Sequence, residues 1–188
     1  LVNSFGKTVM AAFAAAVKID SFAYMPVQDF GNAFSTFIAQ NYGARDEERI
    51  RRGIKSAVGT AFVFCVVIST AVCILARPLM GLFIQPEETE IIAIGVGYLR
   101  IEASCYFGIG LLFLLYGFYR AVKRPGMSVV LTVISLGTRV ALAYLLSAMP
   151  SVGVTGIWVA VPIGWVLADL AGVAYYWSKK TRLLHEEV

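Results

Sequence analysis

The 188-residue chain has few charged side chains for its length. Charged residues make up 15% of the sequence and hydrophobic residues 59%, whereas soluble domains have about 25% and 45–50%. The mean hydropathy is +0.74, and the apolar residues form long runs. A soluble domain of this length could not bury so much apolar surface. The composition therefore excludes an ordinary soluble protein and predicts an integral membrane protein.

Histidine and reactive cysteine are also scarce. His185 is the only histidine and lies in the polar segment near the end of the sequence. Cys65, Cys73 and Cys105 lie inside apolar runs without a CxxC pair, and such cysteines usually act as small hydrophobic side chains. Histidine-based metal sites and catalytic triads are thereby excluded, and other metal binding is left open. HExxH, GxSxG and P-loop motifs are absent, so we expect no enzyme and no bound cofactor.

The positive charge of the chain does not point to nucleic acid. The net charge is +4, but the Lys and Arg residues occur in short clusters between apolar runs. That distribution suits the anionic headgroups of membrane lipids. We therefore expect lipid contacts and no nucleic-acid partner.

The apolar runs predict an all-α polytopic bundle of about five transmembrane helices plus a truncated one. The truncated helix would be Leu1–Phe5, and because the sequence starts at Leu1 within an apolar stretch we expect further sequence upstream. The spans are predicted at residues 8–42, 54–76, 89–122, 127–148 and 154–177, followed by a polar tail at 178–188.

The first and third spans are long for a bilayer. About 35 residues at 1.5 Å per residue exceed a hydrocarbon core of about 30 Å, so these helices must tilt, kink or protrude. Pro26 is the predicted kink of the first span, since proline cannot donate a backbone hydrogen bond. Gly108 and Gly110 are the predicted hinge of the third span, and Arg77–Pro78 is expected to end the second.

Basic residues alternate between the turns of the predicted bundle. The turns after the first and third spans and the tail together hold eleven Lys and Arg residues, while the alternate turns hold little beyond Arg77 and acids. By the positive-inside rule these turns and the C-terminus are predicted to be cytoplasmic. The eleven residues are Arg45, Arg49, Arg51, Arg52, Lys55, Arg120, Lys123, Arg124, Lys179, Lys180 and Arg182.

Charged residues within spans are costly to bury and are therefore functional candidates. The first helix carries Lys18, Asp20 and Asp29. Asp29 follows the predicted kink by three residues, and the amides of Gln28 and Asn32 are near it in sequence. This group could bind a cation or a proton. Alternatively, Asp29 pairs with a cation on a neighbouring helix or lies near the water interface.

The later spans hold three further candidates. Glu102 lies early in the third span and is either solvated or part of a transport site. Arg139, in the middle of the fourth span, needs a counter-charge from Glu102, Asp29 or Asp169. Asp169, in the fifth span, forms either a structural ion pair or part of a cation or substrate site. Trp158, Pro162 and Trp165 on the same helix are predicted to pack rather than to line a cavity.

Three stretches carry a family resemblance. PVQDFGNAFSTFIAQNYGARDEERIRRG, beginning at Pro26, is similar to a segment in the second half of multidrug and toxic compound extrusion (MATE) transporters. GLFIQPEETEIIAIGVGYLRI and YRAVKRPG resemble that family's next segment and its Arg-containing turn. The resemblance covers nearly the whole chain in the same order.

The resemblance implies a twelve-helix transporter of two six-helix lobes that works by alternating access. This chain would be most of the C-terminal lobe, and its partner would be the missing N-terminal lobe. The coupling ion would be sodium or a proton, and the substrates would be organic, drug-like compounds. The stretch YFGIGLL at residues 106–112 lacks the acid that some members carry midway along the matching helix, so no coupling site follows from the match.

The leading hypothesis is therefore one lobe of a cation-coupled antiporter that exports amphipathic, often cationic, organic compounds across the plasma membrane. We expect this membrane to be a bacterial inner membrane. Two alternatives stay open. Related folds move lipid-linked precursors, so the chain could belong to a lipid flippase. It could also belong to a membrane assembly or anchor subunit that transports nothing.

Overall fold

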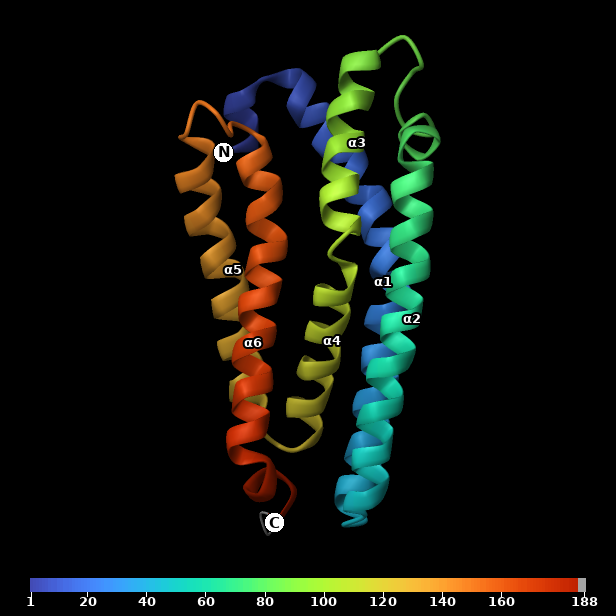
Figure 1. Cartoon of the computed structure of the whole chain (residues 1–188), viewed down its shortest axis with the longest axis vertical. Coiled ribbons are helices and arrows are strands. Elements are labelled where there is room, and N and C mark those ends of the chain that lie inside the picture. Colours follow the sequence, from blue (N-terminus) through green and yellow to red (C-terminus); the bar gives the residue numbers. More distant parts are fainter. Residues whose placement is uncertain (186–188) are drawn as a thin grey trace.

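In the part of the chain that the computed structural model describes, all regular secondary structure is helical (Figure 1). The backbone is described for residues 1–185 and the side chains for residues 1–179, so the last residues of the predicted tail, 186–188, lie outside the described residues. The elements are η1 (Val2–Phe5), α1 (Lys7–Gly43), α2 (Glu47–Met80), α3 (Thr89–Ala103), α4 (Tyr106–Ala121), α5 (Pro125–Ser147) and α6 (Thr155–His185).

The predicted all-α membrane bundle is confirmed. By length and hydropathy α1, α2, α5 and α6 can each cross a membrane, and α3 with α4 forms a bent pair that serves as a fifth span. The helices extend beyond three of the predicted span boundaries. The second helix starts at Glu47, where Asp46 caps it by accepting a hydrogen bond from the backbone N–H of Arg49 at 2.9 Å. It also continues through Pro78, and α6 extends to His185, so the predicted tail begins as helix.

The predicted third span is present as a broken helix, but its hinge does not lie at the predicted residues. The chain bends by 51° between α3 and α4, at Ser104 and Cys105. Hydroxyl groups replace helical hydrogen bonds at this break. The Ser104 hydroxyl donates to the carbonyl of Ile101 at 2.8 Å, and Ser69 of α2 donates to the carbonyl of Ala103. Backbone groups at membrane depth need such partners, so these side chains allow the helix to break there.

The predicted hinge glycines therefore have another role. Both lie inside α4 rather than at the break. A Cβ at Gly110 would lie 2.8 Å from the Sγ atom of Cys65, and Gly108 lies against Trp165. These glycines allow close helix packing, as small residues commonly do in membranes. Pro26 lies inside α1, which remains helical on both sides of it.

The helices form two pairs joined by the broken span. In Figure 1, α1 and α2 lie on one side, α5 and α6 on the other, and α3 and α4 between them. α1 contacts α2, α3 and α4, whereas α5 packs mainly against α6. α1 and α4 approach closely because Gly31 and Gly117 face each other across the contact. The arrangement places the break beside the middle of α1.

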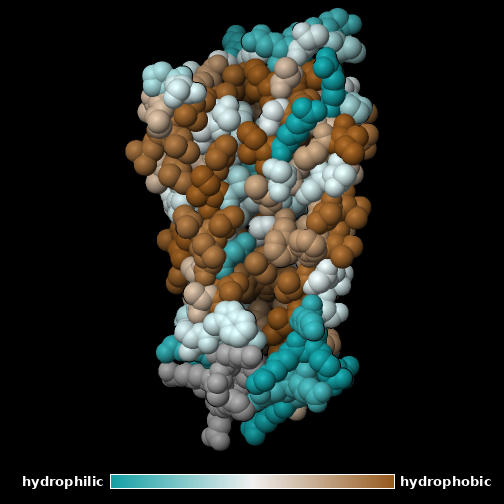
Figure 2. Space-filling model, in the orientation of Figure 1, coloured by the Kyte–Doolittle hydropathy of each residue, from teal (hydrophilic) through white to brown (hydrophobic). Residues whose placement is uncertain are grey.

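The surface has the pattern of a membrane protein. Figure 2 shows hydrophobic residues over the middle of the bundle and hydrophilic residues at both ends. α2 and α5 expose many large apolar side chains, among them Val63, Ile74 and Val133. The α1–α2 turn, the α4–α5 turn and the C-terminal end of α6 all lie at the lower end in Figure 1. The predicted basic clusters therefore share one end of the bundle.

Candidate functional site

Two carboxylates from different helices are buried in the middle of the bundle. Asp20 on α1 is 5% exposed, and Glu102 near the end of α3 is fully buried. The Tyr106 hydroxyl donates a hydrogen bond to Asp20 Oδ1 at 2.6 Å, and the Tyr98 hydroxyl donates to Oδ2 at 3.5 Å. Asp20 is thus held between tyrosines from both halves of the broken span. These four residues, with Arg139, are called the acid cluster below.

Glu102 is the least satisfied member of the acid cluster. Both of its carboxylate oxygens are buried and have no hydrogen-bond partner among the described residues. Arg139 on α5 interacts electrostatically with both Asp20 and Glu102, yet it forms no salt bridge within the described part of the chain. Buried oxygens without donors are costly. They are well suited to receive a proton or a small cation.

The helix break explains how the acid cluster forms. Tyr98 and Glu102 lie at the lower end of α3, and Tyr106 is the first residue of α4. The 51° bend turns these two segments around Asp20. Aromatic packing closes one side, where the ring of Trp158 contacts Tyr98 edge-on at 5.1 Å and stacks on Phe13 at 5.2 Å.

Asp169 lies apart from the acid cluster. It is 7% exposed, and its Oδ1 atom has no hydrogen-bond partner among the described residues. Its neighbours are Gly108 and Trp165, and the ring hydroxyl of Tyr116 is close enough for an electrostatic interaction. Arg139 is within electrostatic range of Glu102 but forms no salt bridge with it in the described part of the chain, and Asp169 lies elsewhere. Pro162, Trp158 and Trp165 of α6 are buried in helix packing.

Gln28 and Asn32 belong to a separate polar groove of about 430 Å³ between α1, α4 and α5. Asn32 Oδ1 accepts a hydrogen bond from Arg120 Nη2 at 3.0 Å. The groove is lined by Gln28, Asn32, Phe113, Tyr116, Arg120, Ser128, Val129 and Thr132.

Asp29 lines neither of these sites. It is exposed on α1 and makes no hydrogen bond or salt bridge with any residue that the structure describes. Lys18 is exposed as well. The core-facing residues Gly31, Phe34 and Ile38 lie on the opposite side of this helix. A role of Asp29 in ion binding therefore stays a prediction.

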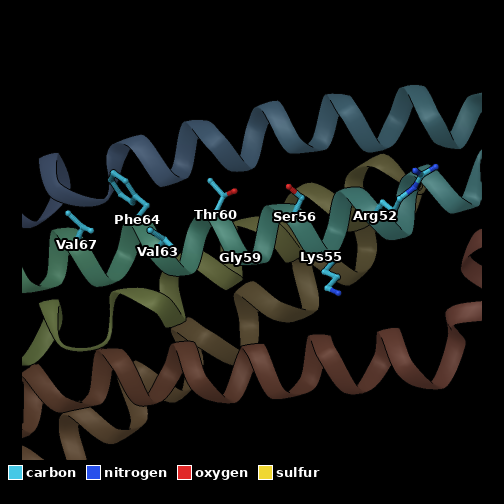
Figure 3. Close-up of a pocket in the computed structure, with 8 residues that line it drawn as sticks. All are labelled: Arg52, Lys55, Ser56, Gly59, Thr60, Val63, Phe64 and Val67. Carbon is cyan, nitrogen blue, oxygen red and sulfur yellow. The ribbon is translucent and has the colours of Figure 1, made fainter.

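A further groove of about 870 Å³ runs along the exposed side of α2. Its lining residues all come from that helix, with Arg52 and Lys55 toward one end and Val63 and Val67 toward the other (Figure 3). No polar groups converge on it from a second element. It has the character of a lateral helix surface rather than of a binding site.

The sequence interpretation missed the two tyrosines of the acid cluster and did not single out Asp20. The signal was present, because Tyr98, Glu102 and Tyr106 recur at four-residue intervals and would share one face of a helix. Among the described residues, no group of three or more His, Cys, Asp or Glu side chains could hold a metal ion. The acid cluster therefore offers only its two carboxylates and the tyrosine hydroxyls.

Comparison with known proteins identifies similar transporters. The family model MatE matches residues 1–145. The chain is 26% identical to the probable multidrug resistance protein YoeA of Bacillus subtilis over 97% of its length, and 27% identical to the FAD transporter of Shewanella oneidensis over 92%. It spans only 40% and 37% of the lengths of these two relatives.

Solved structures agree with the observed fold. The MATE transporter ClbM in complex with Rb⁺ superimposes with a TM-score of 0.83 at 26% identity, over 96% of this chain and 42% of that protein. The bent form of the Vibrio cholerae MATE transporter VcmN gives a TM-score of 0.83 at 21% identity, over 97% and 40%. The fold of the chain therefore matches about two fifths of each transporter.

Proposed function

This chain belongs to the MatE family, and we propose that it forms most of one lobe of a cation-coupled multidrug antiporter that exports amphipathic organic compounds by alternating access. The relatives that it matches are transporters, and the apolar helices fit a membrane location. The chain covers about 40% of such proteins, so the second lobe would complete the substrate path.

The acid cluster is the observation that carries this proposal. With Asp20 and Glu102 ionised, their two negative charges exceed the single positive charge of Arg139. A net charge within the membrane is costly. One sodium ion or one proton at Glu102 would make the cluster neutral. The lobe could then change conformation without carrying an unbalanced charge through the hydrocarbon.

Each residue of the cluster has a distinct part in this scheme. Tyr106 and Tyr98 fix the carboxylate of Asp20, while the oxygens of Glu102 stay available as acceptors. The break between α3 and α4 lies two residues after Glu102. Broken helices commonly surround ion sites in transporters. Ion binding at Glu102 would therefore bias the bend and the conformation of the lobe.

We further propose that the basic end of the bundle faces the cytoplasm of a bacterial cell. The α1–α2 and α4–α5 turns and the C-terminal end of α6 lie at this end (Figure 1). Anionic lipids and the positive-inside rule both favour that orientation.

The test is dye efflux by the full-length transporter in lipid vesicles under an imposed sodium or proton gradient. Glu102→Gln should lower gradient-driven efflux by about tenfold or more, since it removes the ion-binding charge. Glu90→Gln is the matched control, because Glu90 is exposed in the first turn of the same α3 helix. Comparing the two gradients identifies the coupling ion.

Asp29→Asn serves as a competing substitution in the same assay. If coupling depended on the exposed Asp29, that variant would lose efflux and Glu102→Gln would retain it. Full gradient-driven efflux by Glu102→Gln at equal expression would refute the role of the acid cluster.

A further inference from the structure

The polar groove between α1, α4 and α5 has no part in the ion coupling described above. It contains none of the acid-cluster residues, and it has an open volume of about 430 Å³. Its walls combine amide, hydroxyl and guanidinium groups with the apolar side chains of Phe113 and Val129. Polar groups beside apolar walls are typical of sites for amphipathic ligands.

Among the described residues, Arg120 is the only charged one that lines this groove. Its Nε atom donates to the carbonyl of Tyr116 at 3.3 Å, and its Nη2 atom donates to Asn32 Oδ1 at 3.0 Å. These two bonds hold the guanidinium against α1. Nη1 makes no hydrogen bond with a described residue, and Arg120 forms no salt bridge within that part of the chain. The guanidinium is thus positioned and still has donors to offer.

The hydroxyl groups beside Arg120 are held on the same wall. The Ser128 hydroxyl donates to the carbonyl of Tyr116 at 3.4 Å, and the Thr132 hydroxyl donates to the Tyr116 hydroxyl at 3.4 Å. These bonds join α4 to the beginning of α5. The groove therefore has a built polar wall rather than a collection of loose surface side chains.

The charge that lines the groove comes from Arg120. No carboxylate of a described residue lines it. Asp29 follows Gln28 in sequence, but neighbouring residues point about 100° apart around a helix, and Asp29 is not a lining residue. Lys123 and Arg124 follow in the α4–α5 turn at the same end of the bundle. A cationic ligand would meet repulsion here, whereas an anionic group would be attracted.

We propose that this groove binds the anionic group of a transported amphipathic compound, a carboxylate, phosphate or sulfonate, with Arg120 as its main ligand. A guanidinium binds such oxygens with two parallel hydrogen bonds. The apolar body of the compound lies against Phe113 and Val129. This inference rests on the proposed transport function and adds to it an anionic substrate class.

The test measures equilibrium binding of two dyes to the purified full-length transporter. Fluorescein is anionic and rhodamine 6G is cationic, and both have a xanthene ring system of similar size. Fluorescence anisotropy in zwitterionic nanodiscs gives the affinity for each. The wild-type protein should bind fluorescein, and Arg120→Gln should weaken that binding by about tenfold or more, as expected for losing a charge-assisted hydrogen bond.

Three further variants sharpen the comparison. Arg120→Lys keeps the positive charge but loses the planar guanidinium group. Its affinity for fluorescein should therefore lie between those of the wild-type protein and Arg120→Gln. Asn32→Ala removes the bond that positions Arg120 and should weaken fluorescein binding less than Arg120→Gln. Arg45→Gln is the matched control, because it removes an exposed positive charge from the other basic turn and should leave binding unchanged.

Several results would overturn the inference. One is a wild-type protein that binds rhodamine 6G but not fluorescein. Another is an Arg120→Gln variant that loses both dyes equally or keeps its affinity for fluorescein. A third is fluorescein binding that disappears when the nanodiscs contain anionic phosphatidylglycerol, because Arg120 would then bind a lipid headgroup rather than a transported compound. The binding measurement needs no ion gradient. A negative result in it would therefore not affect the Glu102→Gln efflux test of the proposed function.

Discussion

Replacing Gly117 with alanine should separate α1 from α4. A Cβ at this position would lie 2.6 Å from the carbonyl oxygen of Gly31 and 3.3 Å from the Cβ of Ser35. The nearest atom is backbone, so no side-chain rotation can relieve the clash. The two helices would have to move apart by about 0.4 Å or more, and overpacking of this kind costs about 1–3 kcal/mol.

The expected loss of stability is large enough to measure. This chain spans only 40% of a full-length relative, so in the full-length transporter 1 kcal/mol corresponds to about 1–2 °C in Tm, and Gly117→Ala should lower Tm by about 1–6 °C. The assay is thermal unfolding of the purified full-length transporter in detergent. Gly137→Ala on α5 is the control, because a Cβ there meets nothing within 4 Å and alanine favours helix by about 1 kcal/mol.

The comparison of these two glycine variants tests whether α1 and α4 are in close contact. Gly137→Ala should leave Tm unchanged or raise it. If Gly117→Ala melted at the wild-type temperature, the close contact between α1 and α4 would not exist as described, and the packing role assigned to the glycines of α4 would be refuted.

Two other predictions follow from the acid cluster and from the orientation. Tyr106→Phe removes the 2.6 Å hydrogen bond to Asp20 and should lower gradient-driven efflux by about tenfold, the effect of losing one hydrogen bond to a charged group. Tyr144→Phe is the control, because Tyr144 is exposed on α5, and it should leave efflux unchanged. Equal efflux by the two variants would contradict the role of Tyr106. A membrane-impermeant thiol reagent should label Glu87→Cys in intact cells but Arg45→Cys only after permeabilisation, and the reverse pattern would overturn the proposed orientation.

Much of the fold could be predicted because membrane insertion depends on local composition. Each span needs a long apolar run, and each turn interrupts it with charge, glycine or proline. The helix break at Ser104 and Cys105 could not be predicted in this way. It depends on Ser69, a residue of another helix that satisfies the carbonyl of Ala103. Only tertiary contacts supply such a partner, so glycines of the same span were wrongly chosen as the hinge.

The candidate site was also predicted only in part from the sequence. Glu102 and Arg139 were recognised from the sequence, because a charge within an apolar run is costly wherever the helix points. The sequence did not show which side of its helix each charged residue lies on, toward the core or toward the outside. Asp29 and Asp20 lie on the same helix, yet one is exposed and the other is buried beside Tyr98 and Tyr106.

The sequence by itself determined that this is a membrane protein of about five helical spans, with its basic turns at one end, because hydropathy and charge are properties of short segments. Tertiary structure decided which carboxylates meet, where the third span breaks, and that Arg120 and Asn32, 88 residues apart, share one groove. Those features depend on how helices rotate and pack against one another. That packing is fixed by contacts between residues far apart in the chain.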